Sequence, residues 1–274
     1  MKTIIHAVVV AVVLCLLFTV NSYAQRRTVV TIGGSWWNAG YTWEDDDGNE
    51  LTKVDPGNNF GPYVSISRNR WNLGVSYLSG KYPIKSFESE GVSYDVDIDM
   101  NRSDLNISIG YRVHRLVNIF AGLKNLTWSM ESTYLWSYDF LDDWGSRWTG
   151  ETDATEKYTF SGPLYGGGVS CVIPLGRGGF YGFASLAGLG GTITRKEELK
   201  VEYFDYKESS EQDLSSTLVA LNAGIGYRFP GGLGINAGYR GDYISTESEK
   251  VLGVSAKENV RVQGLVLTLS YTFR

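Results

Sequence analysis

The chain has 274 residues, a formal net charge of −5 and a composition rich in glycine (33), tyrosine (18) and tryptophan (8). Its mean hydropathy is −0.15, and after Ala24 no apolar run approaches the ~18 residues that a transmembrane helix needs. These features exclude a helical membrane domain after Ala24 and favour twisted β-sheet, either soluble or closed in a membrane.

The start of the chain has the features of a secretory signal peptide. Lys2 supplies the positive charge, the run 7–20 is apolar, and a Ser-Tyr-Ala sequence precedes Gln25. A retained membrane anchor is the alternative, but the apolar run is short for that role. We therefore expect residues 1–24 to be removed and residues 25–274 to form one domain.

The last stretch, from Gly264 to Arg274, is the clearest strand of the chain. Alternate residues differ in polarity, as they do in an extended strand with two unlike faces. About 9–11 tilted residues of this kind cross the hydrocarbon of a bilayer. The face predicted to contact lipid carries Leu265, Leu267, Leu269, Tyr271 and Phe273, and the other face carries Val266, Thr268, Ser270 and Thr272.

The same alternation recurs and predicts ten strands. They are expected at residues 28–43, 60–67, 71–77, 104–112, 117–124, 158–173, 180–190, 219–228, 233–242 and 264–274. Short connections alternate with long ones, which is typical of outer-membrane barrels with short periplasmic turns and long extracellular loops. The pattern predicts an all-β, closed, antiparallel up-and-down barrel. Twelve strands, with an extra hairpin in a long loop, and a soluble sandwich are the alternatives.

The acidic residues follow the same division. All but two of the 30 Asp and Glu residues fall in five predicted long loops, at residues 44–59, 80–103, 128–157, 192–214 and 245–259. The two exceptions, Asp104 and Asp242, fall on predicted lumen faces. Acidic outer loops would repel phosphate, so nucleic acid is not expected as a partner.

This pattern resembles the small bacterial outer-membrane β-barrel proteins, the broad group that includes OmpX-like and OmpW-like barrels. The resemblance spans nearly all of residues 25–274 and implies an integral protein of the bacterial outer membrane, with outer-membrane lipid as a partner. Members of the group usually end on an aromatic residue, which resembles the signal read by the barrel-assembly machinery. Tyr271 and Phe273 match that signal in the C-terminal strand, and this chain adds Arg274.

Histidine is the general base best suited to neutral pH. After residue 24 the chain has one histidine, His114, in a predicted periplasmic turn, and one cysteine, Cys171, which leaves no intramolecular disulfide. The ten strands resemble the omptin proteases, but the Asp–His arrangement of that family has no counterpart in this sequence. We expect no enzyme, no cofactor and no metal centre.

Polar residues on the predicted inner faces have two interpretations. They form a network that largely fills the lumen, or they line a narrow diffusion channel, since small barrels are filled and large ones hold water. Buried charges must be paired in either case, and we expect Lys124 to pair with Asp104 and Arg240 with Asp242. The residues assigned to this network or pore lining are Asp104, Arg112, Lys124, Arg228, Arg240 and Asp242.

The long loops supply two further candidate sites. Aromatic residues in the longest loop could stack on a sugar, contact a surface partner or pack the loop on itself; they are Trp136, Tyr138, Trp144 and Trp148. Three alternating carboxylates form a weak cation site or a solvated acidic face; they are Asp95, Asp97 and Asp99. We therefore expect a non-enzymatic barrel with external loops for surface interaction, and the alternative is a porin-like channel for small solutes.

Overall fold

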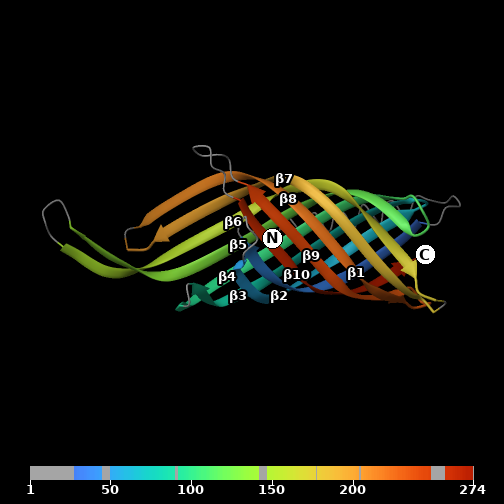
Figure 1. Cartoon of the computed structure of the whole chain (residues 1–274), viewed down its shortest axis with the longest axis horizontal. Helices are drawn as coiled ribbons and strands as arrows, with labels where there is room; N and C mark the ends of the chain where they lie inside the picture. Colours follow the sequence, from blue (N-terminus) through green and yellow to red (C-terminus); the bar gives the residue numbers. More distant parts are fainter. Residues whose placement is uncertain are drawn as a thin grey trace.

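The computed structural model describes residues 28–44, 50–89, 92–141, 147–176, 178–203, 205–247 and 257–273, and these form ten strands (Figure 1). None of the described residues belongs to a helix that is long and apolar enough to cross a membrane. The predicted signal peptide lies outside the described residues. The strands are β1 (Thr28–Glu44), β2 (Glu50–Arg68), β3 (Trp71–Ser89), β4 (Val92–Arg112), β5 (Val117–Leu141), β6 (Arg147–Pro174), β7 (Phe180–Val201), β8 (Tyr206–Arg228), β9 (Leu233–Glu247) and β10 (Lys257–Phe273).

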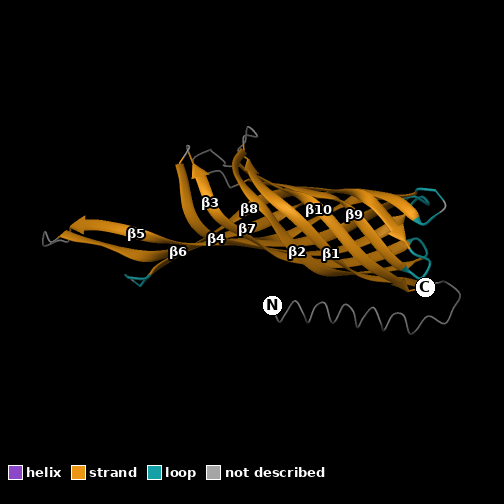
Figure 2. Ribbon diagram, turned by 90° about the horizontal axis from the view of Figure 1, so that it is seen from below, coloured by secondary structure: helices purple, strands orange, loops and turns teal. Residues whose placement is uncertain are grey.

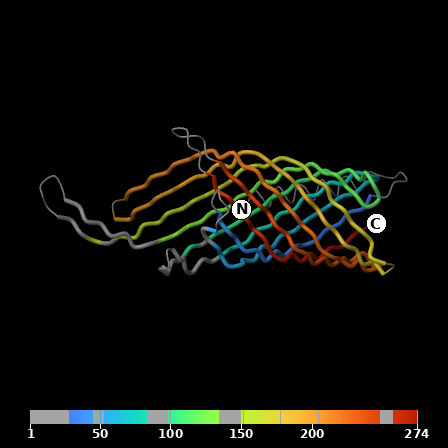
Figure 3. Tube along the Cα trace, in the orientation of Figure 1, coloured from blue at the N-terminus to red at the C-terminus, as the bar shows by residue number. Residues whose placement is uncertain are grey.

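Each strand pairs antiparallel with its sequence neighbours, and β10 returns to pair with β1, so the sheet is a closed barrel. The closing pair runs in unbroken register from Val30 opposite Phe273 to Glu44 opposite Asn259; the trace in Figure 3 colours β1 blue and β10 red. Closure removes every unpaired strand edge from the bilayer, where an unpaired backbone group would cost several kcal/mol. The predicted ten-strand barrel is therefore confirmed, and the twelve-strand and sandwich alternatives are wrong.

The outer face of the barrel is apolar, as the alternation predicted. On β10, Leu265, Leu267 and Leu269 are exposed, whereas Val266 and Ser270 are buried. The same holds around the barrel for the exposed residues Ile32, Leu73, Ile109, Ile119, Val169, Leu186, Leu221, Ile225 and Ile235. In water this belt would be an aggregation hazard. It is suited to contact with lipid hydrocarbon.

Short turns gather at one end of the barrel, together with the C-terminus, and we call this the turn end (Figure 2). Aromatic rings pack against each other there, with centroid distances of 4.9 Å for Trp71 and Tyr111 and 4.8 Å for Tyr271 and Phe273; all but the half-buried Tyr111 are exposed. Amphipathic aromatic rings are enriched where a membrane meets water. The ring pairs therefore mark one edge of the apolar belt.

At the opposite end the strands are much longer than predicted. Most of the expected long loops are paired strand: β5 and β6 remain in register as far as Leu141 opposite Arg147, and β7 and β8 as far as Val201 opposite Tyr206. We call the paired segments 131–141, 147–157, 194–201 and 206–213 the outer arms; they project beyond the barrel in Figures 1 and 2. The prediction of loops was wrong because it took charge as a sign of irregular chain, whereas a strand outside the membrane carries charges on both faces at little cost.

Candidate functional site in the barrel lumen

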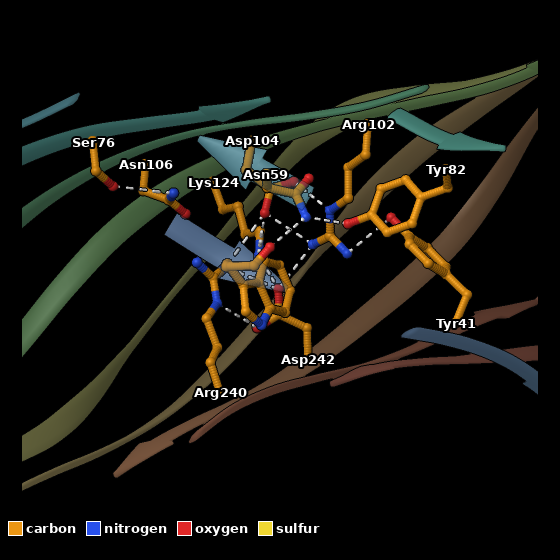
Figure 4. A network of polar contacts seen from close by, with 11 residues as sticks. Tyr41, Asn59, Ser76, Tyr82, Arg102, Asp104, Asn106, Lys124, Arg240 and Asp242 are labelled. Atoms are coloured by element: carbon orange, nitrogen blue, oxygen red, sulfur yellow. Dashed lines mark hydrogen bonds and ion pairs between the residues drawn. The ribbon is translucent and has the colours of Figure 1, made fainter. Parts of the chain in front are cut away.

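Five ionised side chains meet inside the barrel. Arg102 and Asp104 lie two residues apart on β4, Arg240 and Asp242 lie two apart on β9, and Lys124 comes from β5. Residues two apart in a strand share a face, so each pair points inward together. Because β4 and β9 lie on opposite sides of the closed sheet, their side chains meet across the lumen (Figure 4).

The contacts in this ion cluster are short. Arg102 donates from Nε to Asp104 Oδ1 and from Nη2 to Asp104 Oδ2, both at 2.8 Å. Asp242 Oδ2 accepts from Arg102 Nη2 at 2.9 Å, from Lys124 Nζ at 2.5 Å and from Arg240 Nη2 at 3.0 Å. Lys124 Nζ also lies 3.2 Å from Asp104 Oδ2, and Arg240 Nη2 lies 3.3 Å from the same oxygen. The two carboxylates are thus shared among three cations.

The ion cluster is buried and unequal in charge. The side chains of Arg102, Asp104, Lys124 and Asp242 are at most 4% exposed, whereas Arg240 is 16% exposed. Moving one such ion out of water costs several kcal/mol unless opposite charges and hydrogen bonds compensate. Three cations and two carboxylates leave one positive charge in excess, and Arg240 is the member closest to solvent.

Aromatic residues complete the shell on one side. The Trp37 ring lies under both guanidinium groups, 4.2 Å from Arg240 Cζ and 5.1 Å from Arg102 Cζ, and cation–π attraction increases when the site is desolvated. Arg102 Nη1 donates to the hydroxyl of Tyr41 at 3.2 Å. Asn59 Nδ2 donates to the Tyr82 hydroxyl and, at 3.2 Å, to the Trp37 carbonyl. The guanidinium of Arg102 is therefore held by two carboxylates, a phenol and two rings.

Beyond the ion cluster, toward the outer arms, the lumen is filled by apolar side chains that we call the apolar plug. Its members come from nine strands and pack as one buried group. A filled lumen was predicted, but its outer half is apolar rather than polar. The plug comprises Tyr41, Tyr82, Met100, Leu126, Trp128, Phe160, Leu164, Ile193, Leu214, Leu218, Ile244, Val260 and Val262.

On the other side of the ion cluster, toward the turn end, the lumen is open. A cavity of about 1090 Å³ lies there, and a second of about 230 Å³ extends it toward Lys124; Asn106, Asn222 and Arg240 line both. We call the two together the vestibule. The walls of the larger cavity include Tyr63, Ser65, Tyr181, Phe183, Asn236, Val266 and Thr268. In Figure 4, Asn106 and Ser76 lie on the side of the cluster opposite Tyr41 and Tyr82.

The structure brings together four of the six predicted lumen residues, Asp104, Lys124, Arg240 and Asp242. It does not bring Arg112 or Arg228 to them. Arg112 is eight residues along β4 from Asp104, roughly 27 Å at the rise of an antiparallel strand, and is exposed beside the turn. Arg228 is exposed at the vestibule mouth, with its Cζ 5.9 Å from the centre of the Tyr181 ring. Arg112 and Arg228 are the last residues of β4 and β8, so both lie beside the short turns and away from the ion cluster.

Sequence reasoning missed Arg102, because residues 80–103 were expected to form a loop. The signal was present in the spacing: Met100, Arg102, Asp104 and Asn106 alternate along a single strand face, and extending β4 by two residues includes Arg102 in the lumen. Trp37 was missed because only the polar residues of the predicted inner faces were assigned to the lumen site.

The predicted loop sites lie mainly outside the described side chains. Trp136 and Tyr138 are in the β5 arm and Trp148 is in the β6 arm, whereas Trp144 is outside the described residues. The backbones of Asp95, Asp97 and Asp99 belong to β4, and their side chains are outside the described part. Among the described residues, no group of three or more His, Cys, Asp and Glu side chains is placed to hold a metal ion.

Where arm side chains are described, charges pair along and across strands. Lys157 faces Glu131 directly across β5 and β6, with Nζ 3.1 Å from Oε2. Lys196 donates to Glu198 at 2.6 Å, and this hydrogen bond lowers the pKa of Glu198 below its ordinary value. At the base of the β6 arm, the hydroxyl of Tyr158 donates to Glu156. Exposed pairs of this kind contribute little stability, so they keep the arms soluble more than they hold them together.

His114 lies in the turn between β4 and β5, where it is exposed and its Nδ1 accepts the Leu116 N–H at 3.4 Å. The ion cluster is far along the barrel from this turn, so the histidine does not contact either carboxylate. Cys171 on β6 is a free thiol. The arrangement in the lumen is therefore suited to holding charge in place and to binding, and it contains no nucleophile–histidine pair among the described residues.

Comparison with known proteins agrees with this architecture. Residues 75–273 match the family model described as "Outer membrane protein beta-barrel domain". No curated protein matches the sequence significantly. The outer membrane protease OmpT from Escherichia coli superposes with a TM-score of 0.54 at 11% identity, covering 92% of this chain and 99% of OmpT.

Two other solved structures are more distant. The translocator domain of the autotransporter NalP from Neisseria meningitidis has a TM-score of 0.46 at 10% identity and covers 99% of this chain and 98% of that one. Ail, the attachment invasion locus protein of Yersinia pestis, has a TM-score of 0.34 at 12% identity, and the match covers 89% of this chain and 98% of Ail. At these identities the OmpT superposition shows a shared barrel fold and carries no information on activity.

Proposed function

Because the chain belongs to the outer membrane protein beta-barrel domain family and is integral to the bacterial outer membrane, we propose that it is a non-enzymatic scaffold with a closed lumen. The barrel anchors the outer arms and presents them to partners outside the cell. The lipid-facing belt and the turn-end aromatic rings hold the barrel in the membrane, and the ion cluster and apolar plug keep solutes from crossing it.

The observation that carries this proposal is the continuous filling of the outer half of the lumen. Met100, Leu126, Leu164, Ile193 and Val262 are 0% exposed, so no water-wide path passes between them. Side chains fill small barrels in this way, whereas water channels are found in larger ones. A lumen closed by apolar packing favours a structural role over transport.

Conductance across a planar bilayer tests the closed lumen. We expect the purified protein to give no steady ion current. Two variants are compared with the wild type. The double variant Leu126→Ala, Leu164→Ala removes volume from the plug and should give brief current openings. The control Leu265→Ala, on the lipid face, should give none. A steady current from the wild-type protein would contradict the closed scaffold.

A narrow diffusion channel is the second candidate, and the vestibule is the observation that favours it. It opens half of the lumen and ends at a single layer of ions backed by the apolar plug. Transport would require the plug to move, so a channel would show voltage-dependent or ligand-dependent openings in the same bilayer experiment.

The role of the arms is tested by shortening them. Thr133 lies opposite Thr155, so an Asn-Gly turn in place of residues 134–154 would join the two strands in register. We expect this variant to fold and to keep the different gel migration of boiled and unboiled samples. If the barrel failed to form without these residues, the arms would be part of its stability and not a display element.

A further inference from the structure

Among the described residues, the charged ones that line the vestibule are all cationic. Arg228 lies at its mouth, and Arg240 and Lys124 lie at its inner end. Of the described residues that line either cavity, none is acidic. A low-dielectric cavity whose charges share one sign concentrates ions of the opposite sign. The vestibule thus attracts anions that enter from the turn end.

The inner end of the vestibule also carries charge that the protein does not neutralise. The three cations of the ion cluster exceed its two carboxylates by one, and the excess is nearest to solvent at Arg240. Its Nη2 and Nε bind the carboxylates, while its Nη1 makes no hydrogen bond among the described residues. A single negative charge placed at Nη1 would make the cluster neutral.

Amide groups stand beside this guanidinium. Asn222 and Asn106 line both cavities together with Arg240. Within the described chain, Asn222 Oδ1 is buried with no hydrogen-bond partner, so its amide is free to turn and donate an N–H to an anion. The free Nη1 of Arg240 and the two amides can each donate to an oxygen of a carboxylate, and hydrogen bonds to an ionised acceptor are among the strong ones.

The walls of the vestibule are apolar and aromatic. Tyr63, Phe183 and Val266 line it, and the volume of its larger cavity, about 1090 Å³, is that of sites which enclose organic molecules of drug size. An inorganic ion would leave these walls in contact with water, whereas the apolar part of an organic anion would cover them. From these features we infer that the vestibule binds a small organic monocarboxylate, with its carboxylate at Arg240 and its apolar body against Phe183 and Val266.

Isothermal titration calorimetry on the folded full barrel, in an uncharged detergent and chloride-free buffer, tests this inference with benzoate as the probe. We expect benzoate to bind, and benzyl alcohol, which has the same ring without the charge, to bind at least about tenfold more weakly. Chloride is the third titrant. Chloride that bound as tightly as benzoate would overturn the assignment to an organic anion.

Variants locate the site. Arg240→Gln should weaken benzoate binding by about tenfold or more, Arg240→Lys should restore part of it, and Arg70→Gln, which changes an arginine outside the vestibule, should leave it unchanged. Ser65→Phe fills the vestibule without touching the ion cluster and should weaken binding as well. Gel migration of unheated samples confirms folding of each variant. Benzoate binding that is absent in the wild type, or that survives both Arg240→Gln and Ser65→Phe, would overturn the inference.

Discussion

The ion cluster makes a quantitative prediction, because its charges are unequal. In Asp242→Asn one carboxylate remains for three buried cations, so the excess rises from one positive charge to two. Removing one partner of a buried pair costs about 3–5 kcal/mol, a large part of a typical stability of about 5–15 kcal/mol. Arg240→Gln leaves two cations and two carboxylates and changes the most exposed member, so we expect it to cost less than Asp242→Asn.

The double variant separates charge balance from lost contacts. Asp242→Asn combined with Arg240→Gln again has one positive charge in excess, so it should be more stable than Asp242→Asn alone by about 1–2 kcal/mol, within the usual coupling of contacting residues. The assay is equilibrium unfolding of the vesicle-embedded barrel in guanidinium, followed by tryptophan fluorescence. Effects of the two single changes that add within about 0.5 kcal/mol would refute the charge-balance reasoning.

Two further predictions concern the wall of the barrel. A Cβ on Gly264 would lie 1.7 Å from the Asn38 carbonyl oxygen across the closing seam, so Gly264→Ala should prevent closure. At Gly188 an added Cβ would have nothing within 4 Å, so the control Gly188→Ala should fold normally. Gel migration before and after boiling distinguishes the two variants. Leu267→Arg places a charge on the lipid face and should lower the free energy of unfolding in vesicles by about 2–4 kcal/mol. The control Ser209→Arg, at an exposed arm residue, should lower it by almost nothing. Equal losses in the two variants would show that Leu267 does not face lipid.

The sequence predicted the wall of the barrel well because lipid imposes a strict rule. Each strand that faces hydrocarbon must place apolar residues at every second position, and the run from Leu265 to Phe273 shows this without interruption. The turn signals around Arg68–Arg70 and Phe229–Gly232 then fix where strands β3 and β9 begin. These features are local, so a single sequence contains them.

The parts that could not be predicted depend on the lumen and on water. The arms lie beyond the bilayer, where neither face needs to be apolar, and so residues such as Lys196 and Glu198 gave no sign of pairing in strands. The ion cluster joins β4 and β9 across the lumen, and contacts over 140 residues of separation leave no periodic trace. Only the two-residue spacing of Arg102 and Asp104 shows that both lie on one face.

The division of the lumen follows from residue size. A barrel with a fixed number of strands has a nearly constant backbone radius, so the side chains decide which levels are filled. Ser65, Ser108 and Gly122 line the turn half and leave it open, whereas Trp128 and Phe160 fill the arm half. The ion cluster lies at the boundary, where it separates apolar packing from solvent. One level of the barrel therefore excludes solutes while the next has room to bind them, and a closed scaffold and a vestibule open to one side are compatible in the same fold.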